Sequence, residues 1–415
     1  MTSQTTTIPK TWKSAPIKDV VDIVIDNRGR NPEYYVPQGI PVIDNVLIKG
    51  ERKIDLGETR RFIDEETYSS FIRKYNQKND VLITLVGNGY GNVALSPEAR
   101  SIIMQNTIGL RCNDTGDNIF LFYNLLQSKR SLTDLNIGAA QPSIKVGDLL
   151  NVELNFPPFP EQCAIATVLS SLDDKIELLR EQNKTLEATA QAIFKEWFVN
   201  FNFPGATGKM IDSELGEIPE GWNVEKITDI FDFIKGSEPG ANNYSTERLS
   251  SNYVPFYRVQ DISQYGDIPS IYVDENLLKG KIFGADDILV SLDGTIGRVF
   301  IGGSGGHSGG IRRVLGRKDF IKKSLILCFL KSPKFQNDLE SFSGAETTIK
   351  HAGGAIEHIK FALNDDVCVK FGETFDPFFY KVISNITQIQ TLSTLRDTLL
   401  PKLMKGEVRV EGFEN

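Results

Sequence analysis

The chain carries few of the side chains that most often perform catalysis or hold metal ions. It has three histidines, and all of them lie in the second half of the sequence, at His307, His351 and His358. A catalytic dyad or metal site present in both halves therefore cannot use histidine. The four cysteines are far apart and form no Cys-x-x-Cys pair, at Cys112, Cys163, Cys328 and Cys368. This spacing predicts neither a zinc site nor a disulfide framework, and we expect reduced, mostly buried thiols.

Two segments are similar to cofactor motifs without matching them. Residues 31–34 read Asn-Pro-Glu-Tyr; adenine methyltransferases carry Asn-Pro-Pro-Tyr, but here Glu33 replaces the second proline and no glycine-rich cofactor loop precedes the segment. Residues 205–210 read Gly-Ala-Thr-Gly-Lys-Met, whereas a phosphate-binding loop has wider glycine spacing and ends in Ser or Thr. We therefore predict no catalytic site, metal or cofactor in this chain. An unrecognised DNA methyltransferase or nuclease stays as an alternative.

Composition limits the class of protein. A length of 415 residues predicts two or three domains. The chain has 46 Lys and Arg against 54 Asp and Glu, and its net charge of −8 argues against a non-specific nucleic-acid binder. Local basic clusters are compatible with this balance, because net charge averages over the whole surface. No run of 18 apolar residues occurs and the first ten residues are polar, so we expect a cytoplasmic protein with no membrane segment.

A long internal repeat determines which elements position the polar residues. Residues 79–87 match residues 286–294, so that Leu82 and Leu289 are equivalent and 207 positions apart. Both segments indicate a strand that enters a glycine turn. Three further pairs keep the same order: Trp12 with Trp222, residues 39–42 with 253–256, and residues 138–144 with 344–349. A repeat of this length is a domain rather than a solenoid unit.

Each copy is predicted to be rich in strands. Short β-branched runs such as residues 22–25 alternate with Gly, Pro and Asn turns. Helical spacing of apolar residues occurs in modest segments such as residues 118–128 and 321–332. The fold class is therefore α+β.

A different kind of segment follows each copy. Residues 160–198 contain no glycine and no interior proline, and their apolar residues recur in steps of three and four, which is typical of a coiled-coil seam. A second helix of the same kind is predicted from about Phe378 to Met404, because Leu186 matches Leu392 and Ile193 matches Leu399 at one offset. The two apolar stripes must pack on each other or on a partner's helices, or each stripe packs only on its own globule.

One seam position of the first helix is polar. Asn183 is either a buried residue that fixes helix register or a solvent-facing residue near a helix crossing. The predicted domains are residues 1–159 and 204–373, with helical spacers at residues 160–203 and 374–415.

These helical residues carry a family resemblance that extends from Trp12 to Val410. Residues 159–166, 169–176, 182–187 and 194–198 closely resemble the central helix of Type I restriction-modification specificity subunits. Residues 213–222 are similar to the start of that family's second target-recognition domain, and residues 395–403 to its closing helix. Residues 371–377 depart from the family's Pro-x-Glu-Gln lead-in, which leaves the start of the second helix open.

The resemblance implies two pseudo-symmetric target-recognition domains separated by two long antiparallel helices. Each domain is expected to read one half of a bipartite double-stranded DNA site. The helices are expected to set the spacer and to dock two modification subunits that use S-adenosylmethionine. Restriction subunits that use ATP and Mg²⁺ complete the implied complex, and this chain is expected to be non-catalytic. The rival hypothesis is a coiled-coil scaffold whose globules bind proteins instead of DNA.

Polar residues in predicted turns are our candidate DNA-binding residues, because loops on rigid scaffolds carry function. In the first copy they are Arg28, Arg30, Asn88, Tyr90, Asn92, Gln141, Ser143 and Lys145. In the second copy they are Lys235, Thr295, Arg298, Arg312, Arg313, Lys350 and His351. The candidate residues of the helix seam and subunit interface are Ile165, Leu169, Leu172, Ile176, Leu179, Asn183, Leu186, Ile193, Trp197, Ile389, Leu392, Leu399 and Leu403.

Overall fold

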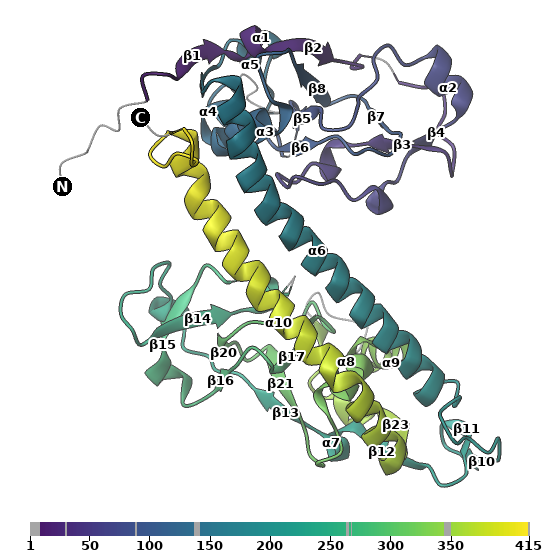
Figure 1. Cartoon of the computed structure of the whole chain (residues 1–415). Helices are drawn as coiled ribbons and strands as arrows, with labels where there is room; N and C mark the ends of the chain where they lie inside the picture. Colours follow the sequence, from purple (N-terminus) through teal and green to yellow (C-terminus); the bar gives the residue numbers. More distant parts are fainter. Residues whose placement is uncertain are drawn as a thin grey trace. The chain divides into compact units, whose positions relative to one another are not determined.

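The computed structural model divides into two compact units (Figure 1). Unit 1 comprises Met1–Lys175 and Leu392–Asn415, and unit 2 comprises Ile176–Thr391. The structure describes residues 9–29, 31–87, 89–136, 142–262, 265–266, 268–343 and 350–413.

Unit 1 is built on a four-stranded antiparallel sheet with the order β2 (Val21–Ile25), β8 (Thr107–Cys112), β5 (Val81–Thr84) and β6 (Val93–Leu95). All four residues of β5 are buried. Val81 and Ile83 face the core under helix α3 (Asn118–Gln127), and Leu82 belongs to a second cluster on the other face. A strand covered on both faces reads as a continuous apolar run, which is the pattern of this segment.

The other elements of unit 1 surround that sheet. A three-stranded sheet has the order β4 (Phe62–Ile63), β3 (Ile40–Ile43) and β7 (Ile102–Ile103), and β1 (Lys13–Pro16) pairs with β9 (Glu153–Phe156). The short helices are α1 (Ile17–Val20), α2 (Glu65–Ser70), α4 (Lys129–Thr133), α5 (Val146–Leu150) and the 3-10 turns η1 (Asn45–Leu47) and η2 (Leu56–Glu58).

Unit 2 repeats the main sheet of unit 1 strand by strand, and its second sheet has one strand more. Its main sheet has the order β13 (Phe231–Lys235), β21 (Ile311–Gly316), β17 (Ile288–Ser291) and β19 (Val299–Phe300). Its second sheet has the order β15 (Tyr272–Asp274), β14 (Tyr253–Tyr257), β20 (Gly305–His307) and β16 (Ile282–Phe283), and β12 (Asn223–Lys226) pairs with β23 (Lys360–Leu363). The predicted duplication and α+β class are confirmed.

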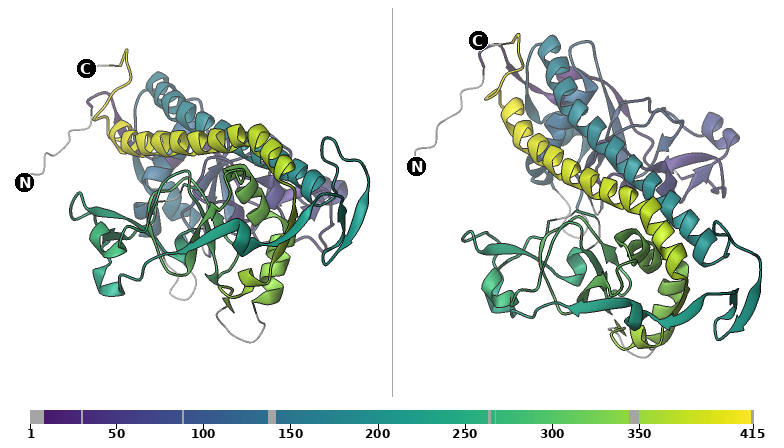
Figure 2. Two further views of the ribbon diagram at one scale, coloured as in Figure 1. Left: turned by 90° about the horizontal axis from the view of Figure 1, so that it is seen from below. Right: turned by 60° about the horizontal axis from the view of Figure 1, so that its bottom comes forward.

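The remaining elements of unit 2 are shorter. They are α7 (Ile227–Ile230), α8 (Lys323–Lys331), α9 (Pro333–Phe342), β18 (Asp293–Gly294) paired with β22 (Lys350–His351), and η3 (Ala241–Asn243), η4 (Val259–Asp261), η5 (Glu275–Leu278) and η6 (Ala355–Glu357). A hairpin of β10 (Met210–Ser213) and β11 (Gly216–Pro219) follows the first long helix and stands off the main sheet (Figure 2). Helices predicted at residues 118–128 and 321–332 correspond to α3 and α8.

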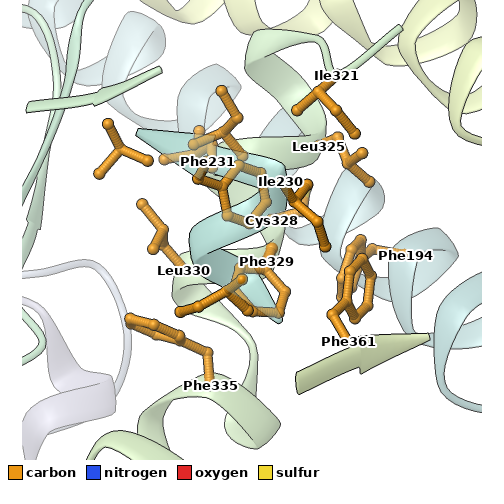
Figure 3. Close-up of a cluster of buried hydrophobic side chains, with 14 of the residues drawn as sticks. Phe194, Ile230, Phe231, Ile321, Leu325, Cys328, Phe329, Leu330, Phe335 and Phe361 are labelled. Atoms are coloured by element: carbon orange, nitrogen blue, oxygen red, sulfur yellow. The ribbon is translucent and has the colours of Figure 1, made fainter. Parts of the chain in front are cut away.

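The core of unit 2 is dense in aromatic rings (Figure 3). The ring of Phe329 on α8 lies with its centroid 4.7 Å from that of Phe361 on β23 and 5.3 Å from that of Phe231 on β13. Phe194, which lies on the first long helix, stacks on Phe361 with the two ring centroids 6.1 Å apart. These contacts attach that helix to the sheet of unit 2.

The backbone corrects one detail of the predicted repeat. The amide of Ile144 donates to the carbonyl of Leu85, and the amide of Ala352 donates to that of Leu292. Ile144 is therefore equivalent to Ala352 rather than to Ile349, and Ser143 is equivalent to His351. The sequence match was shifted because it aligned the glycine residues of the two segments, whereas the structural equivalence follows the strand register.

The two long helices are α6 (Phe159–Phe198) and α10 (Asp365–Met404), each of 40 residues. The predicted start of the second helix, about Phe378, is wrong. The side chain of Asn364 accepts from the amide of Val367 at 3.2 Å and caps the helix at Asp365. Gly372 permits a close approach, since a Cβ there would lie 2.5 Å from a carbon of Lys322. Pro377 lies within the helix and removes one backbone hydrogen bond without ending it.

Inside each unit the two helices run antiparallel. In unit 2, Asn183 of α6 contacts Asn385 of α10, and further along α6 the ring of Phe194 contacts that of Phe371, which comes earlier in α10. Figures 1 and 2 show the two segments side by side there. In unit 1, Asp173 of α6 binds Arg396 of α10. The apolar stripes therefore pack on each other as well as on the globules.

Candidate nucleic-acid interface

In each unit, strand ends and polar loops meet at one edge of the main sheet. In unit 1, Ile25 at the end of β2 pairs with Gly109, and Thr84 at the end of β5 pairs with Thr107 at the start of β8. In unit 2, Lys235 pairs with Arg312, and Ser291 pairs with Ile311. We call this edge, with the loops that leave it, the loop edge.

The loop edge of unit 1 contains an open polar hollow. It is lined by Arg28, Gly29, Asn31, Val86, Gln105 and Asn106. Gln105 has a φ of 47°, a left-handed conformation that is uncommon for a residue with a side chain. Its side-chain amide donates to Asn31 across the hollow. Strained backbone of this kind is found most often at functional sites.

Arg28 is held in this hollow by Asp26. Nε of Arg28 donates to Oδ1 of Asp26 at 2.9 Å and Nη2 donates to Oδ2 at 2.8 Å. The Arg28 amide also donates to Oδ1, at 3.0 Å. The guanidinium beside Asp26 holds the pKa of that carboxyl below its ordinary value. The pair stays accessible, because the side chains are 28% and 33% exposed.

The loop edge of unit 2 is cationic. Lys235 is exposed beside Arg312 in the cross-strand pair. Nη1 of Arg312 donates to the carbonyls of Gly309 and Ile311, and no carboxylate of the described residues lies within ion-pair distance of the guanidinium. Burial lowers the pKa of Arg312, and the nearby charge of Asp293 opposes that shift. A half-buried cation without a bonded carboxylate is suited to an anionic ligand.

Neighbouring arginines of β21 have different roles. Successive residues of a strand face opposite sides, so Arg313 points away from Arg312. Nη1 of Arg313 donates to the carbonyl of Ile282 at 2.9 Å and lies 3.4 Å from Oδ2 of Asp287. These bonds hold the side chain of Arg313 within the protein, and its predicted DNA contact stays a prediction.

A histidine completes the loop edge of unit 2. Nδ1 of His351 lies 2.9 Å from Oδ1 of Asp293, and the His351 side chain is 69% exposed. The backbone of Lys350 pairs with Gly294, next to the exposed Thr295. The side chain of Lys350 lies outside the described residues.

The other candidates are engaged to different degrees. The side-chain amide of Asn92 donates to the carbonyl of Ile48, which indicates a structural turn. Tyr90 is half-buried against the core, and the amide of Ser143 donates to Asn136. Arg298 donates to the carbonyl of Val259 at 3.3 Å. Lys145 is exposed before α5. Arg30, Asn88 and Gln141 lie outside the described residues.

Several site residues were missed by sequence reasoning. Asp26, Asn31, Gln105 and Asn106 join Arg28 only in the folded chain. Arg258 was missed as well, and it binds Asp261 through Nε at 2.8 Å and Nη2 at 3.0 Å. The spacing of Asp26 two residues before Arg28 was a visible signal, whereas nothing in the sequence marks the left-handed Gln105.

The helix seam places the predicted apolar residues in or beside the cores. Six seam residues are buried: Ile165, Leu169, Ile176, Leu179, Asn183 and Leu403. Seven are half-buried: Leu172, Leu186, Ile193, Trp197, Ile389, Leu392 and Leu399.

The buried reading of Asn183 is the one observed. Asn183 is 7% exposed, and its Oδ1 accepts from Nδ2 of Asn385 at 2.8 Å. The solvent-facing alternative is excluded.

Charged residues close the seam of unit 1. Oε1 and Oε2 of the buried Glu161 accept from Nε and Nη2 of Arg409 at 2.5 and 2.9 Å, and Trp12 donates to Oε2 at 3.2 Å. Oδ1 of Asp173 accepts from Arg396 at 2.7 Å, and its Oδ2 accepts from Tyr123 at 2.6 Å.

Among the described residues, no group of three or more His, Cys, Asp or Glu side chains is placed to hold a metal ion. Within the same part of the chain, no helix has the length and apolar character needed to cross a membrane.

Comparison with known proteins agrees with this architecture. A family model described as the Type I restriction modification DNA specificity domain matches residues 9–188 and 219–367. The chain is 28% identical over 424 residues to the Type I restriction enzyme MjaIX specificity subunit of Methanocaldococcus jannaschii, covering 97% of this chain and 95% of the relative. It is 25% identical over 331 residues to the Type I restriction enzyme HindI specificity subunit of Haemophilus influenzae, covering 64% and 71%.

A solved structure shares the fold. The S subunit of the Type I restriction-modification system from M. genitalium superposes with a TM-score of 0.58 at 18% identity, covering 97% of this chain and 98% of that one. The chain belongs to the family of Type I restriction-modification DNA specificity subunits.

Proposed function

We propose that each unit reads one half of a bipartite DNA site with its loop edge. The observation that carries this proposal is the repetition of the main sheet, so that polar loops leave the same edge of the sheet in both units. Two readers on one chain fit a site with two separate halves. As a specificity subunit the chain is non-catalytic, so its part in the reaction is to place the DNA.

The two loop edges divide the labour of binding. Lys235 and Arg312 of unit 2 contact phosphate oxygens, since cations that have no carboxylate partner among the described residues suit the DNA backbone. The polar hollow around Arg28 in unit 1 contacts base edges. Because the whole chain has a net charge of −8, these local cations bind DNA weakly alone and need the partner subunits for full affinity.

The long helices set the spacing and dock the partners. At about 1.5 Å per residue, a 40-residue helix is about 60 Å long, which exceeds one DNA turn of about 34–36 Å. Large apolar side chains remain exposed on both helices, with Leu178 53%, Tyr380 49% and Leu395 45% exposed. We assign these surfaces to two modification subunits.

The chemistry belongs to the partners in this proposal. The modification subunits use S-adenosylmethionine, and restriction subunits, where present, use ATP and Mg²⁺. The complex acts on cellular DNA, so we place this chain in the cytoplasm.

The test is the methylation pattern of host DNA, measured by single-molecule sequencing with the gene intact, deleted and restored. We expect a split motif of two short half-sites to vanish on deletion and return on restoration. If no bipartite mark changes although the modification subunits are expressed and assembled with this chain, the proposal fails, and a protein-binding scaffold is the better reading.

A further inference from the structure

Arg28 presents a defined set of free donors. A guanidinium has five N–H groups, and Asp26 accepts from Nε and from one N–H of Nη2. Both N–H groups of Nη1 and the second N–H of Nη2 have no partner among the described residues. One N–H of Nη1 and the second N–H of Nη2 form the outer edge of the guanidinium, which the aspartate leaves open.

Two other carboxylate-bound arginines of unit 1, Arg100 and Arg61, lack this free edge. Arg100 uses Nη1 and Nη2 on Glu65, at 2.6 and 2.7 Å, so its outer edge is occupied. Arg61 binds Asp44 through Nε and Nη2, but its Nη1 donates to the hydroxyl of Tyr35 at 3.1 Å. Neither of these arginines lines the hollow. The combination of a bound inner edge, a free outer edge and an open position distinguishes Arg28 from both.

The aspartate fixes the direction of the side chain. Two parallel bonds to one carboxylate restrain the long arginine side chain in a single orientation. This restraint lowers the conformational entropy that the side chain loses when it binds a ligand. The Asp26 carboxylate is itself held by the Arg28 amide. Around it, Asn31 and Gln105 bind each other, so the hollow is shaped before any ligand arrives.

We infer that Arg28 reads a guanine in one half of the DNA site, and that Asp26 is the positioning residue that aims it. Guanine offers two acceptors, N7 and O6, in the major groove, and they match two neighbouring N–H groups of the outer edge. In the major groove, adenine offers one acceptor and one donor, cytosine offers a donor, and thymine offers one acceptor beside a methyl group. None of these three bases offers two acceptors to an arginine. This inference rests on the proposed function and names a specificity-determining residue within it.

The same device is absent from the equivalent position of unit 2. Ile25 and Ile234 occupy matching places in their strands, so Asp26 corresponds to Lys235. A lysine at this position has no acceptor for the N–H groups of an arginine. The guanine read by Arg28 therefore belongs to the half-site of unit 1 alone.

The experiment uses the full chain assembled with its modification subunits. The bipartite motif of the wild-type complex is established first by single-molecule sequencing of methylated DNA, because that step tests the proposed function separately. Methylation rates are then measured on duplexes in which each base pair of each half-site is replaced in turn. The variants are Arg28→Ala, Arg28→Lys and Asp26→Asn, with Arg100→Ala as the matched control.

We expect Arg28→Ala to lose discrimination at one guanine of one half-site, by about 5- to 160-fold in the ratio of cognate to substituted rates. Arg28→Lys and Asp26→Asn are expected to lose part of that discrimination at the same base. The other half-site and the Arg100→Ala complex are expected to keep the wild-type profile.

Three results would overturn the inference while leaving the proposed function intact. One is an unchanged profile in Arg28→Ala. Another is a loss at a base other than guanine, or an equal loss in both half-sites. The last is a loss of all methylation in Arg28→Ala with full discrimination kept in Asp26→Asn and Arg28→Lys, because that pattern would make Arg28 a structural residue.

Discussion

The two units share one fold and distribute their charges in opposite ways. At the loop edge, Asp26 of unit 1 corresponds to Lys235 of unit 2, and Ile108 corresponds to Arg312. After the next strand, Asp44 corresponds to Arg258, since each follows the strand that pairs in parallel with β7 or β20. Unit 2 has cations where unit 1 has carboxylates or apolar groups. A duplicated backbone therefore sets positions, and substitution at those positions sets the binding chemistry.

The helix seam shows the reverse distribution. Unit 1 closes its seam with buried ion pairs, Glu161 with Arg409 and Asp173 with Arg396. Unit 2 closes its seam with two amides, Asn183 and Asn385, and with aromatic rings. Losing one partner of a buried ion pair leaves an uncompensated charge, whereas losing one amide leaves only an unpaired dipole. The two seams should therefore differ in their sensitivity to mutation.

The largest effect is expected from Arg409→Ala in unit 1. It leaves Glu161, which is almost fully buried, without its cation, and this should lower the free energy of unfolding by about 3–5 kcal/mol. Urea denaturation followed by tryptophan fluorescence measures the change, since Trp12 binds the same carboxylate. The control is Lys49→Ala, which breaks an exposed pair and should cost less than about 1 kcal/mol. Equal losses in the two variants would contradict the contrast.

A smaller effect is expected from Asn385→Leu in unit 2. Its Asn183 partner would be buried without a hydrogen bond, at a cost of about 1–3 kcal/mol. The double variant with Asn183→Leu should recover most of that stability, because both polar groups are gone. A double-mutant cycle in urea measures the coupling. Additive losses would mean that the amide pair contributes nothing specific.

The third effect is pH-dependent and confined to unit 2. Burial lowers the pKa of His307 to about 4, and the charges of Arg313 and Arg312 add to the shift. The unfolded chain binds a proton there below about pH 6.5 that the folded chain excludes until about pH 4, so stability falls as pH drops through this window.

The equivalent residue of unit 1 is Ile103, which cannot titrate. We expect His307→Ile to remove about 1–2 kcal/mol of the stability lost between pH 7 and pH 5, measured by urea denaturation at both values. If the variant keeps the full wild-type loss, other groups cause the acid sensitivity of unit 2.

The smallest effect is expected in DNA binding by the assembled complex. Arg312→Ile gives unit 2 the residue type found at the equivalent position of unit 1, and should reduce the slope of log K against log salt by about one. Arg313→Ala is the matched control, because Arg313 is bound to Asp287 and Ile282 on the other face. An unchanged slope in Arg312→Ile, or a reduced slope in the control, would refute the phosphate contact.

Much of the architecture could be predicted because it depends on local pattern. The repeat is visible in two buried strands, each followed by a glycine with positive φ, 86° at Gly87 and 73° at Gly294. The α6 helix was predicted to within one residue from its apolar spacing and from its lack of glycine and interior proline. The start of α10 was missed because Gly372 and Pro377 usually end helices, and here packing on Lys322 and the cap at Asn364 outweigh them.

The site was predicted only in part, for a physical reason. Arg28 and Arg312 were chosen because they are cations beside turns, and both lie at the loop edges. Arg313 and Asn92 were also chosen as polar residues of predicted turns, and their side chains bond to backbone carbonyls of the protein. Strand register determines which of two neighbouring strand residues, such as Arg312 and Arg313, faces the loops. A shift of one residue would exchange the two faces. The amino-acid sequence alone does not specify the strand register.

The sequence by itself determined the duplication, the α+β class, the two apolar helices and the family. The duplication, the class and the helices follow from periodicity and local propensity, which act over a few residues at a time. The family follows from the resemblance of the helical residues to known specificity subunits. Only the tertiary structure decided which charges are paired. The pairing of Glu161 with Arg409 joins residues 248 positions apart, and that of Asn183 with Asn385 joins residues 202 apart. Such contacts arise from the packing of whole elements, so the chemistry of each loop edge and seam became readable only in the folded chain.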